Sequence, residues 1–421
     1  MKIAMVSEHA SPLAALGGVD AGGQNVHVAE LAAGLCRLGH EVTVYTRRED
    51  AQAPPTVRTE QGYRVIGVPA GPARVLPKDE LLPHMGEFGE FLREQWRVDR
   101  PDVVHAHFWM SGLAALAAAR PAGIPVVQTF HALGVVKRRH QGAADTSPAD
   151  RIHLEQGIAE QADRIIATCT DEVFELARMG VPRSRTSVIP CGVRLEQFTP
   201  DGPSAAKSAN HRMVSVGRLV PRKGFDTAIT ALTDLPDTEL VLVGGPDDGA
   251  VAEDPEGKRL LALAGELGVR DRLHLVGQVP RTEVAPLLRS ADVVVCTPWY
   301  EPFGITPLEA MACGVPVVAA AVGGLIDTVV DGVTGRLIPA RAPAKLAAAV
   351  QDLCSTPGAA AQYGRAGLER VKARYSWDRI AADTVREYRR VAAAAARAQD
   401  SAPRGSRTLD ATERRAGRST G

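Results

Sequence analysis

The chain has 421 residues, of which 45% are hydrophobic and 23% charged, and its 49 Lys and Arg residues balance its 49 Asp and Glu residues. A chain of this length exceeds one ordinary hydrophobic core and favours two folded domains. A formal net charge of zero gives no global field that would attract nucleic acid, so we expect no nucleic-acid partner.

The six cysteines contain no C-x-x-C pair and lie mostly in apolar patterns, which indicates reduced core residues. An apolar strand pattern begins at Lys2 and leaves no room for a signal peptide, and no apolar run approaches the thickness of a bilayer. We therefore expect a cytoplasmic protein without a transmembrane span. Peripheral contact with a membrane surface and assembly into a homodimer both stay open.

Short β-branched runs alternate with helical patterns from the first residue. The runs KIAMV, EVTVYT, DVVHAHF, PVVQTF and RIIAT predict strands, with helices such as VHVAELAAGLCRLG and LAALAAA between them. KIAMV and PVVQTF are apolar at consecutive positions, which is typical of parallel strands buried on both faces. The pattern predicts a doubly wound α/β domain over residues 1–195.

The second half repeats this organisation after a break. Residues 196–211 lose hydrophobic periodicity and gather Pro, Gly, Ser and Asn, which predicts a linker. The strand patterns MVSVGRL, ELVLVGG, RLHLVGQV, DVVVCTP and VPVVAAA, with the helical KGFDTAITALTDL, predict a second parallel α/β domain over 212–375. A last helix is expected at 376–398, and the nearly apolar-free residues 399–421 predict a disordered tail.

Ligands of two such domains are expected in the crevice beyond the carboxyl ends of the strands. Arg218 follows the first strand of the second domain, and Lys223 stands at the predicted start of the next helix. A guanidinium and an ammonium held together would stabilise a nucleotide-diphosphate leaving group. A solvated helix start is the alternative, but the helix macrodipole disfavours cations there unless an anion is bound.

The segment EPFGITPLE, residues 301–309, joins the strand DVVVCTP to a helix and has a glutamate at each end. Gly304 has no side chain and permits a ligand to approach the backbone closely, and the N–H groups at the helix start could bind a phosphate. Glu309 has an alternative explanation, since TPLE fits a capping box with Thr306 at the N-cap. Glu301 has no such explanation and is predicted to bind ligand.

A glycine-rich loop, GGVDAGGQN at residues 17–25, lies between the first strand and the first helix, where backbone amides can approach a phosphate or sugar. The loop lacks the G-x-G-x-x-G order of a dinucleotide site. The next strand ends in Arg47 and Arg48 instead of the acidic residue that binds an NAD ribose. A nicotinamide-dependent oxidoreductase is therefore the weaker interpretation.

Three histidines are candidates for one crevice. His105 and His107 share one face of a strand by period-2 alternation, and His131 ends the following strand. Their spacing does not match a zinc site, and packing or hydrogen-bonding roles are commoner, so no metal is predicted. We interpret His131 as a polar group that faces a transferred sugar.

Because these motifs occur in order, each at its expected strand end, residues 1 to about 395 resemble glycosyltransferase family 4, the retaining GT-B transferases. The resemblance implies two Rossmann-like domains that face each other across a cleft, with the last helix returning to the first domain. It also implies a UDP-, ADP- or GDP-sugar as co-substrate and no obligatory cofactor or metal. Within the family, the opening SEHASPLAALGGVDAGGQN looks like inositol-phosphate N-acetylglucosaminyltransferases and sucrose-phosphate synthases.

The resemblance implies roles for residues at both walls of the cleft. The implied catalytic residues are His131, Arg218, Lys223 and Glu301. The implied donor-binding residues are Gly23, Arg218, Lys223, Glu301, Phe303, Gly304, Ile305 and Glu309. The implied acceptor-binding residues are His9, Asp20, Asn25, Lys78 and Arg151. The chain departs from the inositol-phosphate enzymes at Phe108 and Ala132, where they carry Tyr and Thr, and so lacks two hydroxyl contacts to an acceptor phosphate.

The sequence thus favours a retaining glycosyltransferase that moves a hexosyl group from an NDP-sugar to a small hydroxyl acceptor, with a phosphorylated polyol or sugar as the hypothesis for the acceptor. A catalytically silent sugar-nucleotide-binding subunit with the same fold is a further alternative. The silent subunit predicts missing motif residues, whereas all are present.

Overall fold

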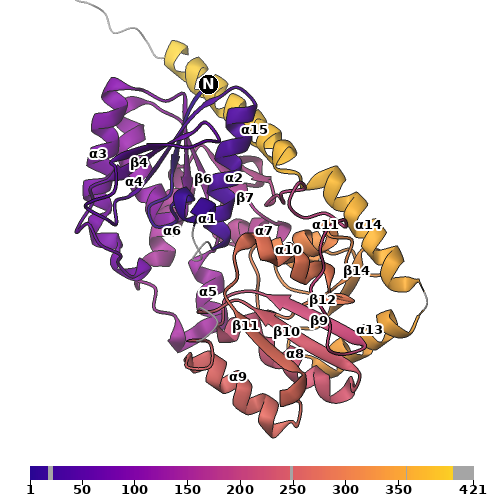
Figure 1. Cartoon of the computed structure of the whole chain (residues 1–421). Helices are drawn as coiled ribbons and strands as arrows, with labels where there is room; N and C mark the ends of the chain where they lie inside the picture. Colours follow the sequence, from indigo (N-terminus) through magenta and orange to yellow (C-terminus); the bar gives the residue numbers. More distant parts are fainter. Residues whose placement is uncertain (18–21, 247–249, 357, 402–421) are drawn as a thin grey trace, which may run out of the picture.

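The computed structural model describes residues 1–17, 22–246, 250–356 and 358–401. It contains two α/β domains, one built on a mainly parallel sheet and the other on a parallel sheet, each with helices on both faces (Figure 1). The predicted fold class is therefore confirmed. The last helix continues to Ser401, so the prediction of a tail from residue 399 was wrong at its first three residues, and from residue 402 on the predicted tail lies outside the described residues. Among the residues described, every helix is either too short or too polar to span a bilayer.

The first domain contains an eight-stranded sheet in the order β3-β4-β2-β1-β5-β6-β7-β8, in which only the pair β3 and β4 is antiparallel. The strands are β1 Lys2–Val6, β2 Glu41–Arg47, β3 Thr56–Arg58, β4 Arg64–Val68, β5 Val103–His107, β6 Val126–Thr129, β7 Arg164–Ala167 and β8 Thr186–Val188. Ile3 of the central strand pairs with Val42 on one side and with Val103 on the other. All three side chains are buried, as expected for a strand covered on both faces.

The second domain contains a six-stranded parallel sheet in the order β11-β10-β9-β12-β13-β14. Its strands are β9 His211–Val216, β10 Thr238–Val243, β11 Leu273–Gly277, β12 Val293–Cys296, β13 Val317–Ala320 and β14 Gly335–Ile338. The chain builds the sheet outwards from β9 in both directions: β10 and β11 lie on one side of β9, and β12, β13 and β14 lie on the other. Ligand sites in open parallel sheets form at such a reversal.

Helices cover both faces of each sheet. They are α1 Pro12–Gly17, α2 Gly23–Arg37, α3 Met85–Val98, α4 Trp109–Ala119, α5 Gly134–Gln141, α6 Arg151–Gln161, α7 Thr170–Arg178, α8 Phe225–Ala231, α9 Pro255–Glu266, α10 Arg281–Arg289, α11 Ile305–Ala312, α12 Gly324–Thr328, α13 Pro343–Ser355, α14 Ala359–Arg374 and α15 Trp377–Ser401. In the first domain, α3 and α4 pack on one face of the sheet, while α2 and α15 pack on the other. In the second domain, α8, α9 and α13 cover one face, and α10, α11 and α14 the other.

The predicted start of the helix after β9 was wrong. Residues Pro221–Lys223 form a short 3-10 turn, and Gly224 has a left-handed φ of +65° before α8 begins at Phe225. A Cβ atom at Gly224 would lie 2.0 Å from the carbonyl oxygen of Thr297, so only glycine fits. Lys223 therefore stands in the turn beside the end of β12 and does not belong to the helix.

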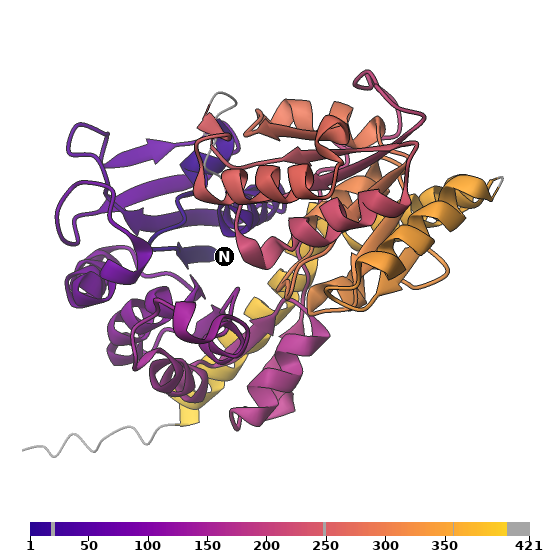
Figure 2. The same ribbon diagram turned by 90° about the horizontal axis from the view of Figure 1, so that it is seen from below.

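The last helix, α15, runs along the first domain (Figure 1; Figure 2). Its Trp377 packs edge-on against His27 of α2, with ring centroids 5.4 Å apart. A Cβ atom at Gly34 of α2 would lie 2.9 Å from Cβ of Ala381, so the two helices approach each other closely. The chain thus leaves the second domain through α14 and completes the core of the first domain with α15.

The burial of Trp377, which is 3% exposed, generates a stability prediction. We expect Trp377→Ala to lower the free energy of unfolding by about 3–5 kcal/mol, because the substitution removes a large buried ring and leaves a cavity. Urea denaturation followed by circular dichroism measures this loss. The control is Arg390→Ala, an exposed residue of the same helix, which should change stability little. Equal stability of the two variants would show that α15 is not part of the core.

Candidate active site

A cleft of about 780 Å³ lies between the two domains, at the carboxyl ends of both sheets. Loops after β1, β4, β5 and β6 form one wall, and loops after β9 and β12 form the other. The predicted site residues that line it are His9, Gly23, Asn25, Lys78, His131, Arg218, Lys223, Glu301, Phe303, Gly304, Ile305 and Glu309. Arg151 is buried and does not line the cleft, and Asp20 lies outside the described residues.

On the second-domain wall, Lys223 and Glu301 form an ion pair with Nζ and Oε2 2.5 Å apart. Burial opposes ionisation of Glu301, but the charges of Lys223 and Arg222 outweigh it and lower the pKa of this carboxyl group. Arg218 forms no ion pair with any residue that the structure describes. Its charge is thus available to an anion in the cleft, whereas Lys223 shares its charge with Glu301.

Glu309 is buried, and its carboxylate accepts a hydrogen bond from the guanidinium of Arg281 at the start of α10. Burial raises the pKa of Glu309, and Arg281 opposes that effect. The capping box considered for this segment is wrong. Helix α11 begins at Ile305 after Gly304, and the hydroxyl of Thr306 donates to the carbonyl of Val216 instead of capping the helix.

Phe303 and Ile305 bring the two domains into contact. The Phe303 ring lies 5.2 Å from His131 and 6.1 Å from His27, both in the first domain. A Cβ atom at Gly23 would lie 3.5 Å from Cδ1 of Ile305, so the glycine lets the start of α2 approach this turn. These contacts close the cleft on the side of His131.

His131 has a left-handed φ of +63°, which is unusual for a residue with a Cβ atom. Its Nε2 lies 3.0 Å from Nδ1 of His107, and this strained backbone places the ring at the cleft wall. Burial lowers the pKa of His131 and of His107 well below the ordinary value, and burial lowers that of His105 to about 3. These imidazoles are therefore neutral at physiological pH.

On the first-domain wall, cations surround the ring of Phe108. Nζ of Lys78 lies 5.2 Å from the ring centroid, and Cζ of Arg151 lies 5.1 Å from it. Burial, followed by the charges of Lys137 and Arg151, lowers the pKa of Lys78 to about 8. Such unfavourable proximity of like charges is typical of an anion site.

Arg151 is already bonded inside the protein. Its Nε donates to Glu155 at 2.8 Å, Nη1 to Ser147 at 3.1 Å and Nη2 to the carbonyl of Ala132 at 2.6 Å. Arg151 is therefore not a solvated surface charge, because the residue is 2% exposed and paired with a carboxylate. It contributes positive charge from behind Phe108, not a side chain that lines the cleft.

Sequence reasoning missed two cations of the cleft. Arg222 precedes Lys223 and lines the cleft, and its Cζ lies 5.4 Å from the centroid of the Tyr300 ring. The two consecutive basic residues Arg222 and Lys223 were a sequence signal that could have identified it. Arg281 pairs with Glu309, which lies on the following helix. No local pattern predicts that pair.

Two family descriptions match the chain. Residues 21–197 match "Glycosyltransferase Family 4", and residues 201–370 match "Glycosyl transferases group 1". Among curated relatives, a D-inositol 3-phosphate glycosyltransferase of Xylanimonas cellulosilytica is 37% identical over 90% of this chain and 94% of that protein. Another of the same description, from Mycobacterium tuberculosis, is 35% identical over 92% of this chain and 83% of that protein.

Solved structures are similar along nearly the whole chain. Sucrose-phosphate synthase from Thermosynechococcus elongatus has a TM-score of 0.84 and 33% identity, covering 94% of this chain and all of that one (100%). HepE of Anabaena, solved in complex with UDP-glucose, has a TM-score of 0.68, 21% identity, and covers 92% of this chain and 100% of that one. At that identity HepE supports the fold alone.

The Arg281–Glu309 pair generates a pH-dependent prediction. Without Arg281, the buried Glu309 carboxyl loses the cation that opposes its raised pKa, so its folded-state pKa rises further above the unfolded value. Its contribution to stability is then present below the unfolded pKa and is lost as pH rises through the folded pKa. We expect the melting temperature of Arg281→Gln to fall by about 2–4 °C more than that of the wild type between pH 5 and pH 8.

Lys258→Gln is the matched control, because Lys258 pairs with Glu253 on the exposed surface. It should follow the wild-type pH dependence. If Arg281→Gln also follows it, the charge of Arg281 has no role in holding Glu309 ionised.

Proposed function

Because the chain belongs to glycosyltransferase family 4 and is a GT-B glycosyltransferase, we propose that it moves a hexosyl group from an NDP-sugar to a small phosphorylated polyol or sugar, with retention of configuration. The observation that carries this proposal is the arrangement of Arg218 and Lys223 at the end of β9, opposite the first-domain wall that contains Lys78. The two walls thus offer separate positive sites for a donor diphosphate and an acceptor anion.

In the proposed mechanism, Arg218 and Lys223 neutralise the diphosphate as it leaves. The acceptor hydroxyl attacks the sugar from the face that the diphosphate leaves, so no covalent enzyme intermediate is needed. Glu301, kept ionised by Lys223, accepts hydrogen bonds from the hydroxyls of the sugar. Glu309 binds the nucleotide ribose, and His131 orients the sugar from the other wall.

UDP is the first donor nucleotide to test, because HepE was solved with UDP and with UDP-glucose. An ADP- or GDP-sugar is also compatible with the diphosphate site. A thermal-shift screen of these nucleotides ranks them, since a bound ligand stabilises the folded state by mass action.

The acceptor proposal rests on Lys78 and on the relatives described as acting on inositol 3-phosphate. Lys78 forms no ion pair with the residues described, and its pKa of about 8 leaves it largely protonated at neutral pH. Arg151 and Lys137 add positive charge behind it. An acceptor phosphate at Lys78 would relieve the repulsion among these three cations.

The donor assignment predicts that Arg218→Ala and Lys223→Ala each lose most transfer activity while the fold survives. Removing one cation from a developing anion costs about 2.7–4 kcal/mol of transition-state stabilisation, or about a hundredfold or more in rate. Initial rates of transfer from the donor chosen by the screen measure this loss. Lys345→Ala, an exposed lysine of α13, is the control and should keep wild-type activity.

Near-wild-type turnover by either variant would contradict the donor assignment. A wild-type protein that binds NDP-sugars without transferring them would instead favour the silent sugar-nucleotide-binding subunit.

The acceptor assignment predicts that wild type prefers inositol phosphate and fructose 6-phosphate over inositol and fructose. Lys78→Ala should reduce this preference about tenfold or more and leave the rates with the unphosphorylated sugars unchanged, because it removes only the charge that binds phosphate. Measurements of kcat/KM with the four acceptors test this. Phe108→Tyr adds to the cleft wall the hydroxyl that the inositol-phosphate enzymes carry at this position and should increase the preference.

Arg151→Lys keeps a positive charge beside Glu155 and should retain most of the preference. If phosphorylation gives the wild type no advantage, or if Lys78→Ala leaves that advantage intact, the acceptor is not phosphorylated at this site.

A further inference from the structure

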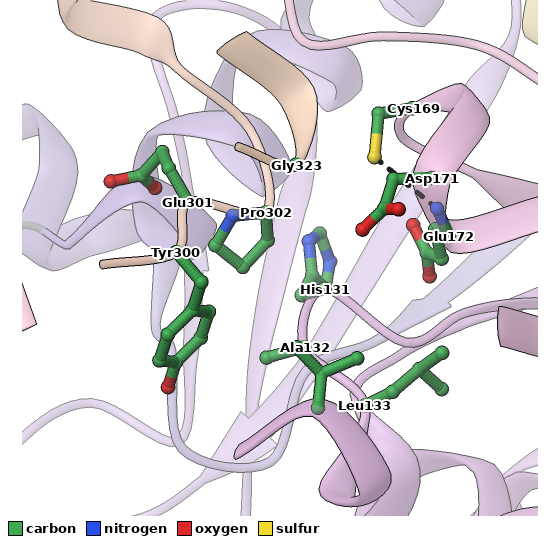
Figure 3. Close-up of a pocket in the computed structure, with 11 residues that line it drawn as sticks. His131, Ala132, Leu133, Cys169, Asp171, Glu172, Tyr300, Glu301, Pro302 and Gly323 are labelled. Carbon is green, nitrogen blue, oxygen red and sulfur yellow. Dashed lines mark hydrogen bonds between the residues drawn. The ribbon is translucent and has the colours of Figure 1, made fainter. Parts of the chain in front are cut away.

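A small pocket of about 40 Å³ lies behind His131, between the two domains. In Figure 3 the His131 ring, which lines the pocket, lies between Tyr300 and Glu301 on one side and Asp171 and Glu172 on the other. The two acidic residues come from the start of α7. A pocket of this volume has room for an ordered water if polar atoms face it.

Two buried polar atoms on this pocket have no hydrogen-bond partner among the residues that the structure describes. They are Nδ1 of His131 and Oε1 of Glu172. The second oxygen of Glu172 accepts hydrogen bonds from the amide and from the hydroxyl of Thr168, both at 2.7 Å. Because a buried polar atom without a partner is costly, two such atoms on one pocket indicate an interaction across it.

The structure fixes the tautomer of the neighbouring His105. The hydroxyl of Thr129 donates its one proton to the carbonyl of Ile166 at 3.0 Å, so it accepts from Nε2 of His105 at 2.9 Å. His105 is neutral, so its Nδ1 carries no proton and accepts from the hydroxyl of Tyr388 at 2.6 Å. The ring of His105 lies tilted against that of His107, with centroids 4.1 Å apart and no hydrogen bond between them, and so leaves the tautomer of His107 undecided.

His107 and His131 share one hydrogen bond that admits two arrangements. In the first, Nδ1–H of His107 donates to Nε2 of His131, whose own proton is then on Nδ1. In the second, Nε2–H of His131 donates to Nδ1 of His107, and Nδ1 of His131 is bare. Both rings are neutral, and Nε2 of His107 is buried without a hydrogen-bond partner among the residues described, so the group that faces Nδ1 of His131 decides between the two arrangements.

We propose that Glu172 is a positioning residue that holds His131 in the Nδ1–H tautomer, through a water molecule in the pocket that accepts from Nδ1–H and donates to Oε1. Burial raises the pKa of Glu172 to about 7, so the carboxylate is ionised and accepts hydrogen bonds at pH 8. His131 then accepts from His107 at Nε2 and keeps one ring orientation at the cleft wall. The consequence for catalysis rests on the proposed function, in which His131 faces the transferred sugar.

The tautomer of His131 is read from its ring ¹⁵N shifts in protein labelled at histidine, at pH 8, with the signals assigned by comparison with His131→Gln. We expect Nδ1–H in the wild type. In Glu172→Gln the amide oxygen keeps the contacts to Thr168 while the NH₂ group donates towards the pocket, so the proton of His131 should move to Nε2. Glu172→Asp keeps the charge and should keep the Nδ1–H tautomer.

The same variants are then assayed for transfer. We expect Glu172→Gln to lower kcat about ten- to hundredfold and to change the KM of donor and acceptor less than twofold, because a hydrogen bond to a charged group orients a ring that substrate binding does not require. Glu172→Asp should recover most of kcat. A purely structural role would instead lower the melting temperature of both variants without moving the proton.

Two matched variants test whether the proton of His131 responds to Glu172 in particular. Glu175→Gln changes the same residue type on the same helix, but Glu175 binds Arg139 and Arg178 outside the pocket, so His131 should not respond. Asp171→Asn changes the second carboxylate of the pocket. If Asp171→Asn moves the proton and Glu172→Gln does not, or if neither does, the proposal is overturned.

The two measurements separate this proposal from the proposed function. The tautomer is measured without donor or acceptor, so a wild type that transfers no sugar would overturn the proposed function while the ¹⁵N shifts still decide the coupling. A proton that moves in Glu172→Gln without any change in kcat would overturn the positioning role.

Discussion

The parallel direction of the strands is the constraint on which this site depends. Because neighbouring strands run the same way, the loops after them gather at one edge of each sheet. The first sheet brings His9 and His131 to one wall of the cleft, and the second sheet brings Arg218 and Glu301 to the other. The glycine at the start of α2 and the turn at Phe303 then let the two walls touch.

Charges on the two walls differ in how they are compensated. Lys223 and Arg281 each face a buried or half-buried carboxylate, so these pairs hold acceptor oxygens in place at the cleft. Among the residues described, Arg218 and Lys78 have no carboxylate partner. A cation that is partly removed from water without a counter-charge is unfavourable until an anion arrives. The uncompensated charges therefore mark where the anionic parts of substrates would bind.

Neutral imidazoles form the layer behind the first-domain wall. Burial lowers the pKa of His27 to about 4 and that of His105 to about 3, so the layer adds no positive charge to the cleft. The hydroxyl of Tyr388 reaches this layer from α15. The helix that crosses from the second domain thus contributes to the support of His131, which connects domain packing to the geometry of the site.

The sequence by itself determined both parallel sheets and the residues at their strand ends, because strand periodicity and strand-to-helix turns are local properties of the chain. Arg218, Lys223 and Glu301 were found in this way. Only the tertiary structure decided that Arg281 pairs with Glu309, 28 residues away, and that Arg151 is buried behind Phe108. It also decided that Glu172 and His131 share a pocket. Such contacts depend on how helices and domains pack. The periodicity of one segment therefore cannot predict which side chains of another segment will contact it.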